Sequence, residues 1–297
     1  MKTIYIKNNQ FNSIDDEICA AIGNFDGVHL GHQELINECK IHNLKSGVIT
    51  FDPHPSIFLK KIPNYPLLTP IKEKKKILES LGIDYLIIIE FNNEMALMPK
   101  EEFIQLLIKL NIKSLVAGYD FTFGKMAEGD IRDLAKHFHV YEIKKYNLDG
   151  IRVSTTYIRE LLASGNVLEA SKLLGRNYSI SGVVEYGNQK GRLIGFPTAN
   201  INYENFFLPK GGVYSVLVYL DNKIYKGICN IGNNPTFNYS STKKLEVHII
   251  NLDEYIYDKK IKIEFIDRIR EEMKFSSADE LVNQLKLDKC YVLDRQN

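Results

Sequence analysis

The sequence predicts two domains of different fold class: an α/β domain with a doubly wound parallel sheet, then an antiparallel β-barrel with one C-terminal helix. Three observations lead to this prediction. The 297 residues exceed the length of one ordinary domain. In the first half, short apolar segments alternate with segments of helical periodicity, and in the second half strand-like segments dominate. We place the boundary near residues 175–177, which gives domains 1–175 and 176–297.

The first half contains apolar segments with the length and composition of buried parallel strands. They are residues 18–23, 47–51, 85–90, 114–117 and 140–143. Helical spacing predicts helices over 33–44, 71–81, 100–110, 131–137, 156–165 and 167–175. Thr69 and Pro70 before the helix 71–81, and Gly82 after it, are typical of helix ends. This alternation is typical of a parallel sheet covered by helices.

The second half contains segments typical of antiparallel strands. They are residues 178–185, 213–220, 224–231, 245–250 and 261–266. The segment 212–220 is apolar on both faces, which favours a closed barrel or a sandwich. Near the end, Ser277 and Glu280 have the spacing of a capping box, which predicts a terminal helix over 280–287.

Composition narrows the class of protein. Lys and Arg number 38 against 37 Asp and Glu, so the net charge gives no reason to expect nucleic acid or anionic lipid as a partner. The first residues are too polar for a signal peptide, and no apolar run has membrane-spanning length, so we expect a cytoplasmic protein. The four cysteines form no CxxC pair and indicate plain thiols.

The segment AIGNFDGVHLGHQELI runs from a predicted strand into a predicted helix. It places Gly27, His29, Gly31 and His32 at a helix N-terminus, where backbone N–H groups favour phosphate. Imidazoles three residues apart can donate hydrogen bonds to the same phosphate. An alternative takes these histidines as zinc ligands, together with His54, Asp26 and Asp52.

The residues GNFDGVHLGH resemble the HxGH signature of nucleotidylyltransferases, in the form of prokaryotic FAD synthetases. The resemblance implies a Rossmann-like domain that transfers the adenylyl group of ATP to FMN, with His29 and His32 as catalytic residues. TFDPHP (50–55) and GYDFTFG (118–124) follow in the order that the family implies. The implied nucleotide- and flavin-binding residues are Gly23, Asn24, Phe25, Asp26, Gly27, Gly31, Asp52, His54, Gly118, Asp120, Phe121 and Phe123.

VSTTYIRELL (153–162) is similar to the Ser/Thr-rich segment of the same family. The resemblance implies binding by Ser154 and Thr155, and a catalytic clamp by Arg159 on the phosphates that leave as pyrophosphate. Thr122 and Tyr157 depart from the family pattern. A P-loop ending at Lys125 is rejected, because the spacing is too long and Met126 stands where Ser or Thr would bind magnesium.

GNQKGRLIGFPTANI (187–201) resembles the riboflavin kinase signature. The resemblance implies that Thr198 and Asn200 hold the magnesium of Mg-ATP, and that Glu246, in LEVHIIN, is the base that activates the riboflavin hydroxyl. The segment containing Arg268 and Arg270 is a binding candidate. The remaining implied binding residues are Gly191, Arg192, Gly195, Phe196, Pro197 and Asn230.

The two resemblances together cover nearly the whole chain. They imply a prokaryotic bifunctional riboflavin kinase/FAD synthetase, with ATP, Mg²⁺ and the flavins riboflavin, FMN and FAD as its small molecules. Two alternatives stay open at this point. Only one half is active, with Thr122 and Tyr157 marking the adenylyltransferase as the impaired one, or the protein is a flavin- or nucleotide-binding regulator.

Overall fold

A computed structural model describes residues 1–8, 10–11, 13–62, 64–187, 191, 194–233 and 243–295. The chain divides into two compact units, Met1–Thr155 and Thr156–Asn297. Among the described residues, no helix is both long and apolar enough to cross a membrane.

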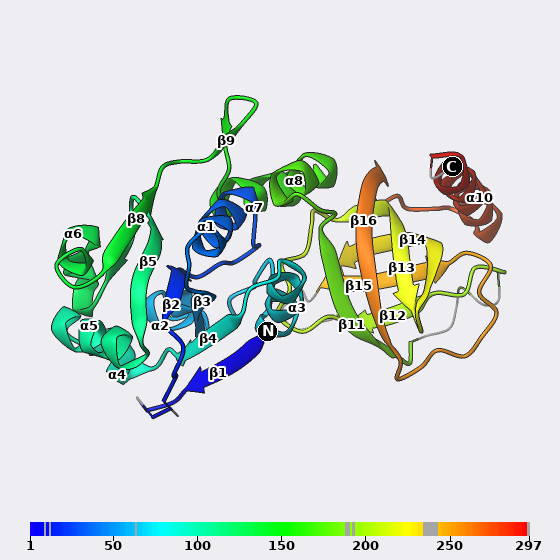
Figure 1. The fold of residues 1–297 in the computed structure, drawn as a ribbon. Helices are drawn as coiled ribbons and strands as arrows, with labels where there is room; N and C mark the ends of the chain where they lie inside the picture. Colours follow the sequence, from blue (N-terminus) through cyan, green and yellow to red (C-terminus); the bar gives the residue numbers. More distant parts are fainter. Residues whose placement is uncertain are drawn as a thin grey trace. The chain divides into compact units, whose positions relative to one another are not determined.

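The first unit is built on a six-stranded, fully parallel sheet (Figure 1). Its strand order is β1-β4-β3-β2-β5-β8. The bounds are β1 Lys2–Ile6, β2 Ile18–Ile22, β3 Lys45–Asp52, β4 Tyr85–Glu90, β5 Ile112–Gly118 and β8 His139–Ile143. All five predicted strands are confirmed. The sequence did not predict β1, because this edge strand pairs only with β4 and is mostly polar or half exposed.

Helices connect these strands. They are α1 Leu30–Lys40, α2 Pro55–Leu59, α3 Ile71–Ser80, α4 Asn93–Leu97, α5 Lys100–Lys109 and α6 Ile131–Leu134. The expected helix 33–44 was misplaced: α1 starts three residues earlier, because His29 caps it, and ends at Lys40. The two five-residue helices, α2 and α4, are too short to show a helical period. The unit also contains the short pairs β6 (Thr122–Phe123) with β7 (Gly129–Asp130) and β9 (Asn147–Leu148) with β10 (Ile151–Arg152), and a 3₁₀ turn at Lys125–Ala127.

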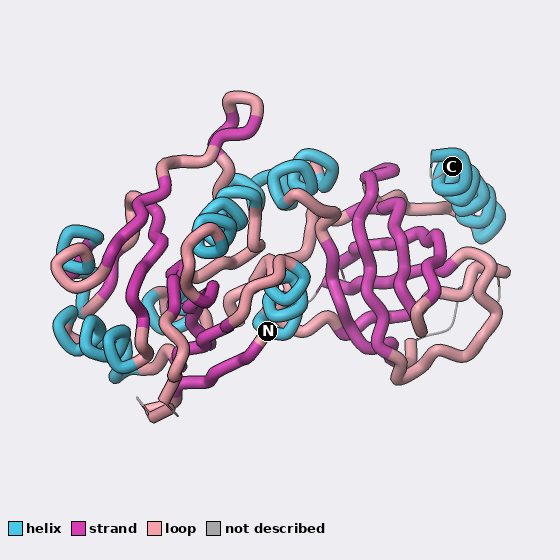
Figure 2. Tube along the Cα trace, in the orientation of Figure 1, coloured by secondary structure: helices cyan, strands magenta, loops and turns pink. Residues whose placement is uncertain are grey.

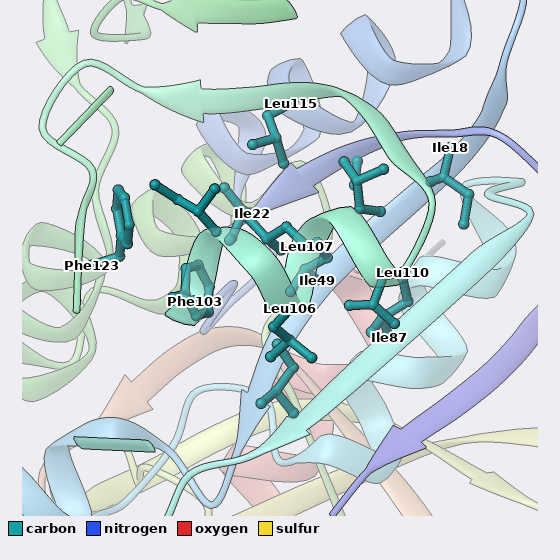
Figure 3. Packing of buried hydrophobic residues seen from close by; sticks show 14 of the residues in the cluster. Ile18, Ile22, Ile49, Ile87, Phe103, Leu106, Leu107, Leu110, Leu115 and Phe123 are labelled. Carbon is teal, nitrogen blue, oxygen red and sulfur yellow. The ribbon is translucent and has the colours of Figure 1, made fainter. Parts of the chain in front are cut away.

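Alternating strand residues build a separate core on each face of this sheet. On one face Ile18 and Ile22 pack with α5 residues such as Phe103 and Leu107, as Figure 3 shows. The opposite face includes Cys19, Val48 and Leu86, and packs with Ile36 of α1 and Leu78 of α3. Both faces are therefore covered, which is why the strand sequences are nearly continuous apolar runs.

The second unit contains a closed barrel of antiparallel strands, drawn in magenta in Figure 2. Its order is β11-β12-β15-β14-β13-β16, and β11 closes it by pairing with β16. The bounds are β11 Ser179–Glu185, β12 Ala199–Asn202, β13 Gly212–Leu220, β14 Lys223–Asn233, β15 Lys243–Ile249 and β16 Lys260–Arg270. The predicted barrel is confirmed; only the four-residue β12 was not predicted. Tyr214, Val216 and Phe265 are fully buried.

The C-terminal helix α10, Ala278–Arg295, extends further than predicted at both ends. At its start, the N–H of Glu280 donates to the Ser277 hydroxyl at 3.2 Å, and the Glu280 carboxylate accepts from the N–H of Ser276 at 2.8 Å and from the backbone of Ser277. Val292 of α10 is fully buried and packs with Val213 and Ile228 of the barrel.

Helices α7 (Thr155–Ser164) and α8 (Val167–Leu174) confirm the predicted pair and pack with the barrel strands. The N–H of Lys210 donates to the Leu162 carbonyl at 2.9 Å, and the N–H of Tyr178 donates to the Ser171 hydroxyl at 3.2 Å. The compact units accordingly divide near Thr155, whereas the sequence placed the boundary near residue 175.

The four cysteines are free thiols. Cys19, Cys39 and Cys229 are buried and Cys290 is exposed.

Candidate active sites

The loop between β2 and α1, residues 23–29, has an unusual backbone. Phe25, Gly27 and Val28 have positive φ angles of 48°, 91° and 41°. For the two residues with a Cβ this conformation is strained, and such strain persists only where the surroundings enforce it. We name this segment, residues 23–29, the GNFDGVH loop.

Two threonines outside the loop hold its middle. The N–H of Thr69 donates to the Asp26 carboxylate at 3.0 Å, and the N–H of Gly27 donates to the Thr69 hydroxyl at 2.8 Å. The Thr155 hydroxyl donates to the Asp26 carbonyl at 3.0 Å. Thr69 was read in the sequence as part of a helix cap, but α3 has no side-chain cap. Its side chain and backbone support the GNFDGVH loop instead.

A buried lysine supports the start of the loop. Lys74 of α3 is 3 % exposed, and its Nζ donates to the Asn24 carbonyl at 2.6 Å and to the Thr50 hydroxyl at 3.2 Å. Burial lowers the pKa of Lys74 to about 8, while the carboxylates of Asp26 and Asp52 act in the opposite direction. The sequence did not single out Lys74, because it lies in a run of lysines on an amphipathic helix.

His29 and His32 lie together at the N-terminus of α1. His29 is the N-cap: its Nδ1 accepts from the N–H of His32 at 3.1 Å. The two imidazole rings stack with centroids 3.6 Å apart. Because Nδ1 of His29 accepts, the proton of the neutral ring is on Nε2, which makes that nitrogen a donor. Gly31 lies between them, and a Cβ there would make a tight contact of 3.3 Å with the His29 ring.

A pocket lies beside this loop at the C-terminal ends of the strands, where ligands bind in open α/β sheets. It brings together eight of the predicted residues: Gly23, Asn24, Phe25, His32, Gly118, Asp120, Phe121 and Phe123. An apolar wall that the sequence did not predict completes it. This wall includes Phe51, Leu59, Phe91, Met98, Phe103 and Met126. The wall comes from α2, the end of α4, α5, the 3₁₀ turn and the ends of β3 and β4, and suits an aromatic ligand.

The other predicted residues of this unit lie around the pocket rather than on its wall. His54 caps α2, with Nδ1 accepting from the N–H of Ser56 at 3.1 Å. Burial raises the pKa of Asp52, and the Lys74 charge partly opposes it. Among the described residues, no three His, Cys, Asp or Glu side chains are placed to hold a metal ion, so the zinc alternative gains no support.

Ser154 and Thr155 end the first unit, and Arg159 belongs to the second. The Arg159 guanidinium lies over the Phe207 ring at 5.0 Å. The implied clamp of Arg159 on the phosphates that leave as pyrophosphate stays a prediction.

In the barrel, three predicted residues lie in one row across adjacent strands. Asn200 on β12 and Asn230 on β14 are both the direct partners of Glu246 on β15. Opposite residues of antiparallel strands point to the same face. The neighbouring row, with Val247 and Cys229, is fully buried. The Asn200–Glu246–Asn230 row is therefore on the outer face of the barrel, and all three side chains are half-buried.

Two glycines before β12, Gly187 and Gly191, lie close to residues at or just before the start of β12. A Cβ on Gly187 would overlap the Asn200 amide, and a Cβ on Gly191 would overlap the Phe196 carbonyl and lie 3.5 Å from the Thr198 hydroxyl. These contacts bring backbone close to Thr198 and Asn200. Gly195 has a φ of 79°, which favours glycine. The predicted Arg192 lies outside the described residues.

Pro197 and Thr198 line a pocket of the second unit, with an apolar and aromatic wall that includes Val247, Tyr255 and Tyr257. His248 fixes the start of this segment, since its Nδ1–H donates to the Pro197 carbonyl at 2.8 Å. Burial lowers the pKa of His248, so the neutral ring is favoured. Phe196 is buried beside the same imidazole.

Arg268 and Arg270 have protein partners. Arg268 donates to the Gly211 carbonyl at 2.8 Å and lies against Gly165 and Gly212. Arg270 is paired with Asp288 of α10 at 2.8 Å. The pairing indicates a structural role for Arg270, and its ligand-binding role stays a prediction.

Comparisons with known proteins match the two halves of the chain to two different families. A family model described as FAD synthetase matches residues 11–157, and one described as riboflavin kinase matches residues 174–294. The Bifunctional riboflavin kinase/FMN adenylyltransferase of Bacillus subtilis is 38 % identical over 97 % of this chain and 96 % of its own length. The protein of the same description from Escherichia coli K12 is 36 % identical, with the same coverage. A crystal structure from Streptococcus pneumoniae described as a macrolide-efflux protein is 33 % identical, covers 98 % of both chains and has a TM-score of 0.89.

A nucleotidyltransferase-like parallel-sheet unit followed by a kinase-type barrel defines a two-domain transferase. The chain belongs to the family of bifunctional riboflavin kinases/FMN adenylyltransferases.

Proposed function

We propose that the second unit phosphorylates riboflavin to FMN and that the first adenylylates FMN to FAD, both with ATP. The observation that carries the proposal is that each family signature falls on side chains that the fold gathers. These are the His29–His32 pair beside an apolar pocket and the Asn200–Glu246–Asn230 row beside a glycine cradle. We do not extend macrolide efflux to this chain, since both family models and the curated relatives name flavin transferases.

In the adenylyl transfer, a phosphate oxygen of FMN attacks the α-phosphorus of ATP, and the bond to the β-phosphate breaks to release pyrophosphate. Charge develops on the oxygens around the α-phosphorus. The donor Nε2–H of His29 and the ring of His32 stabilise this charge, and the N-terminus of α1 adds its dipole. The apolar wall around Phe91 and Phe121 receives the flavin ring.

In the kinase reaction, Glu246 takes the proton of the ribityl 5′-hydroxyl as its oxygen attacks the γ-phosphorus of ATP and ADP leaves. Thr198 and Asn200 offer oxygen ligands beside backbone that a Cβ would obstruct, and this fits the requirements of Mg²⁺. When bound, Mg²⁺ would offset the negative charge of the ATP phosphates. Asn230 flanks the base on its other side.

The direct test is to incubate the purified protein with riboflavin, ATP and Mg²⁺ and to separate the flavins by chromatography. We expect FMN and then FAD, and neither product after chelation of the metal. His29→Ala and His32→Ala should each lower FAD formation by about 10²- to 10³-fold and leave FMN formation intact. Near-normal FAD formation by both variants would refute the role of the histidine pair.

The same assay separates the alternatives. FMN without FAD would indicate that only the kinase half is active, with Thr122 and Tyr157 as the first positions to examine. Tight flavin binding without any product would indicate a regulator.

A further inference from the structure

We propose that Lys74 is a positioning residue for the adenylyl transfer: from beneath the GNFDGVH loop, its ammonium group fixes the Asn24–Phe25 peptide that forms part of the pocket wall. The proposal rests on the proposed function of the first unit. Lys74 is outside both family signatures described above, and with 3 % exposure it does not touch the substrate itself.

The geometry ties the ammonium group to a single peptide. The Asn24 carbonyl accepts both from Lys74 Nζ at 2.6 Å and from the Thr50 hydroxyl at 3.1 Å. Because this peptide is trans, its N–H, which belongs to Phe25, points away from Lys74. Asn24 and Phe25 both line the pocket. Lys74 therefore sets the orientation of a pocket peptide from the buried side.

The loop needs such an external constraint. Phe25 has a left-handed φ of 48° and directly follows the peptide that Lys74 binds. Three residues further on, Val28 at 41° leads into the His29 cap. Thr69 and Thr155 hold Asp26 and Gly27, but Asn24 depends on Lys74 and Thr50. A charge-assisted hydrogen bond is stronger and more directional than the hydroxyl bond alone.

The burial of Lys74 favours a functional role over a packing role. A buried lysine is rare, and an apolar side chain of similar size would fill the same volume without desolvation of a charge. The ammonium group faces the carboxylates of Asp26 in the loop and Asp52 at the end of β3, which favour its charged form. Burial dominates and lowers the pKa of Lys74 to about 8. The charged form of Lys74 therefore lowers the stability of the fold.

The test compares Lys74→Met with Lys76→Met in the full-length chain. Lys76 is on the same helix, 58 % exposed and paired with Glu73, and is the matched control. We expect Lys74→Met to lower kcat for FAD formation from supplied FMN by about 10- to 100-fold, with an unchanged or higher Tm. Its kinase rate should equal that of the wild type, and Lys76→Met should match the wild type in all three measurements.

Two further readouts distinguish positioning from structure. Lys74→Arg, which keeps the charge and the donors, should recover most of the activity; if it is folded yet as inactive as Lys74→Met, restoring the charge and the donors does not restore the rate, and the proposal is overturned. The kcat of the wild type should decrease above pH 8, and the kcat of Lys74→Met should not show this decrease. If Lys74→Met precipitates, Lys74→Arg is compared with the wild type over the same pH range, and its kcat should not show the decrease either.

Failure of this inference is distinct from failure of the proposed function. A wild type that forms FAD while a folded Lys74→Met keeps kcat within twofold refutes the role of Lys74 alone. A wild type that forms FMN but no FAD refutes the adenylyl transfer, and the role of Lys74 with it.

Discussion

Replacement of Asp288 by alanine should strongly lower the melting temperature of the barrel unit. The Asp288 side chain is 1 % exposed and accepts hydrogen bonds from Arg270 Nε at 3.0 Å and Nη2 at 2.8 Å and from Gln284 at 2.9 Å. Asp288→Ala leaves the Arg270 guanidinium, which is only 16 % exposed, without its counter-charge. Breaking a buried pair from one side typically costs about 3–5 kcal/mol. For a unit of this size, that corresponds to a fall in Tm of roughly 10–15 °C.

Differential scanning calorimetry of the full chain would measure this change. Asp294→Ala, an exposed position on the same helix, is the control and should alter stability by less than about 0.5 kcal/mol. The double variant Arg270→Met/Asp288→Leu removes both charges, and should be less destabilised than Asp288→Ala alone. A loss below about 1 kcal/mol in Asp288→Ala would refute the view that Arg270 holds α10. It would leave ligand binding as the expected role of Arg270.

Three further predictions concern the base, the buried lysine and the domain boundary. Glu246→Gln should lower FMN formation by about 10² or more while FAD formation from supplied FMN stays normal; retained phosphorylation would remove Glu246 from the mechanism. Because the pKa of Lys74 falls from 10.5 to about 8 on folding, the unfolded chain binds more protons between these pH values. The free energy of unfolding of the wild type, relative to Lys74→Met, should therefore rise with pH across this window by about 3 kcal/mol; urea titrations that show a constant difference would contradict this. A fragment 156–297 should melt cooperatively and phosphorylate riboflavin. The fragment 176–297 lacks the two helices that pack with the barrel and should melt at a lower temperature. Equal melting temperatures of the two fragments would favour the boundary near 175.

Most of the strands that the sequence predicts are buried apolar runs, and the partly exposed β8 is an exception. Apolar runs such as 85–90 and 212–220 are buried, so the composition of these segments predicts that they are buried strands. The strand β1 is at the edge of the sheet and has no buried apolar run that would predict it. The strand β12 has only four residues, and pairing with its neighbours stabilises it more than its own sequence does. Both strands therefore form because they pair with neighbouring strands, which local sequence does not predict.

The residues of the candidate sites also include some that the sequence predicts and some that it does not. The signature residues His29, His32 and Glu246 are predicted because they lie in segments that resemble the signatures of known families. Their supports were missed, because Thr69 has the sequence context of a helix start and Lys74 that of a solvated lysine. What distinguishes them is a hydrogen bond to a residue more than forty positions away, which no local pattern contains.

The register of the barrel makes the kinase site sensitive to changes in chain length. The row that contains Asn200, Glu246 and Asn230 continues through Val213 to Arg270, across five strands. Deletion of one residue within β15 before Glu246 would turn its carboxylate into the barrel interior, because side chains alternate between the two faces. Insertions in the turn between β13 and β14, by contrast, lie beyond the last strand pair and leave the row in place. Variants of this chain that keep kinase activity should therefore gain or lose residues in its turns but not within β15.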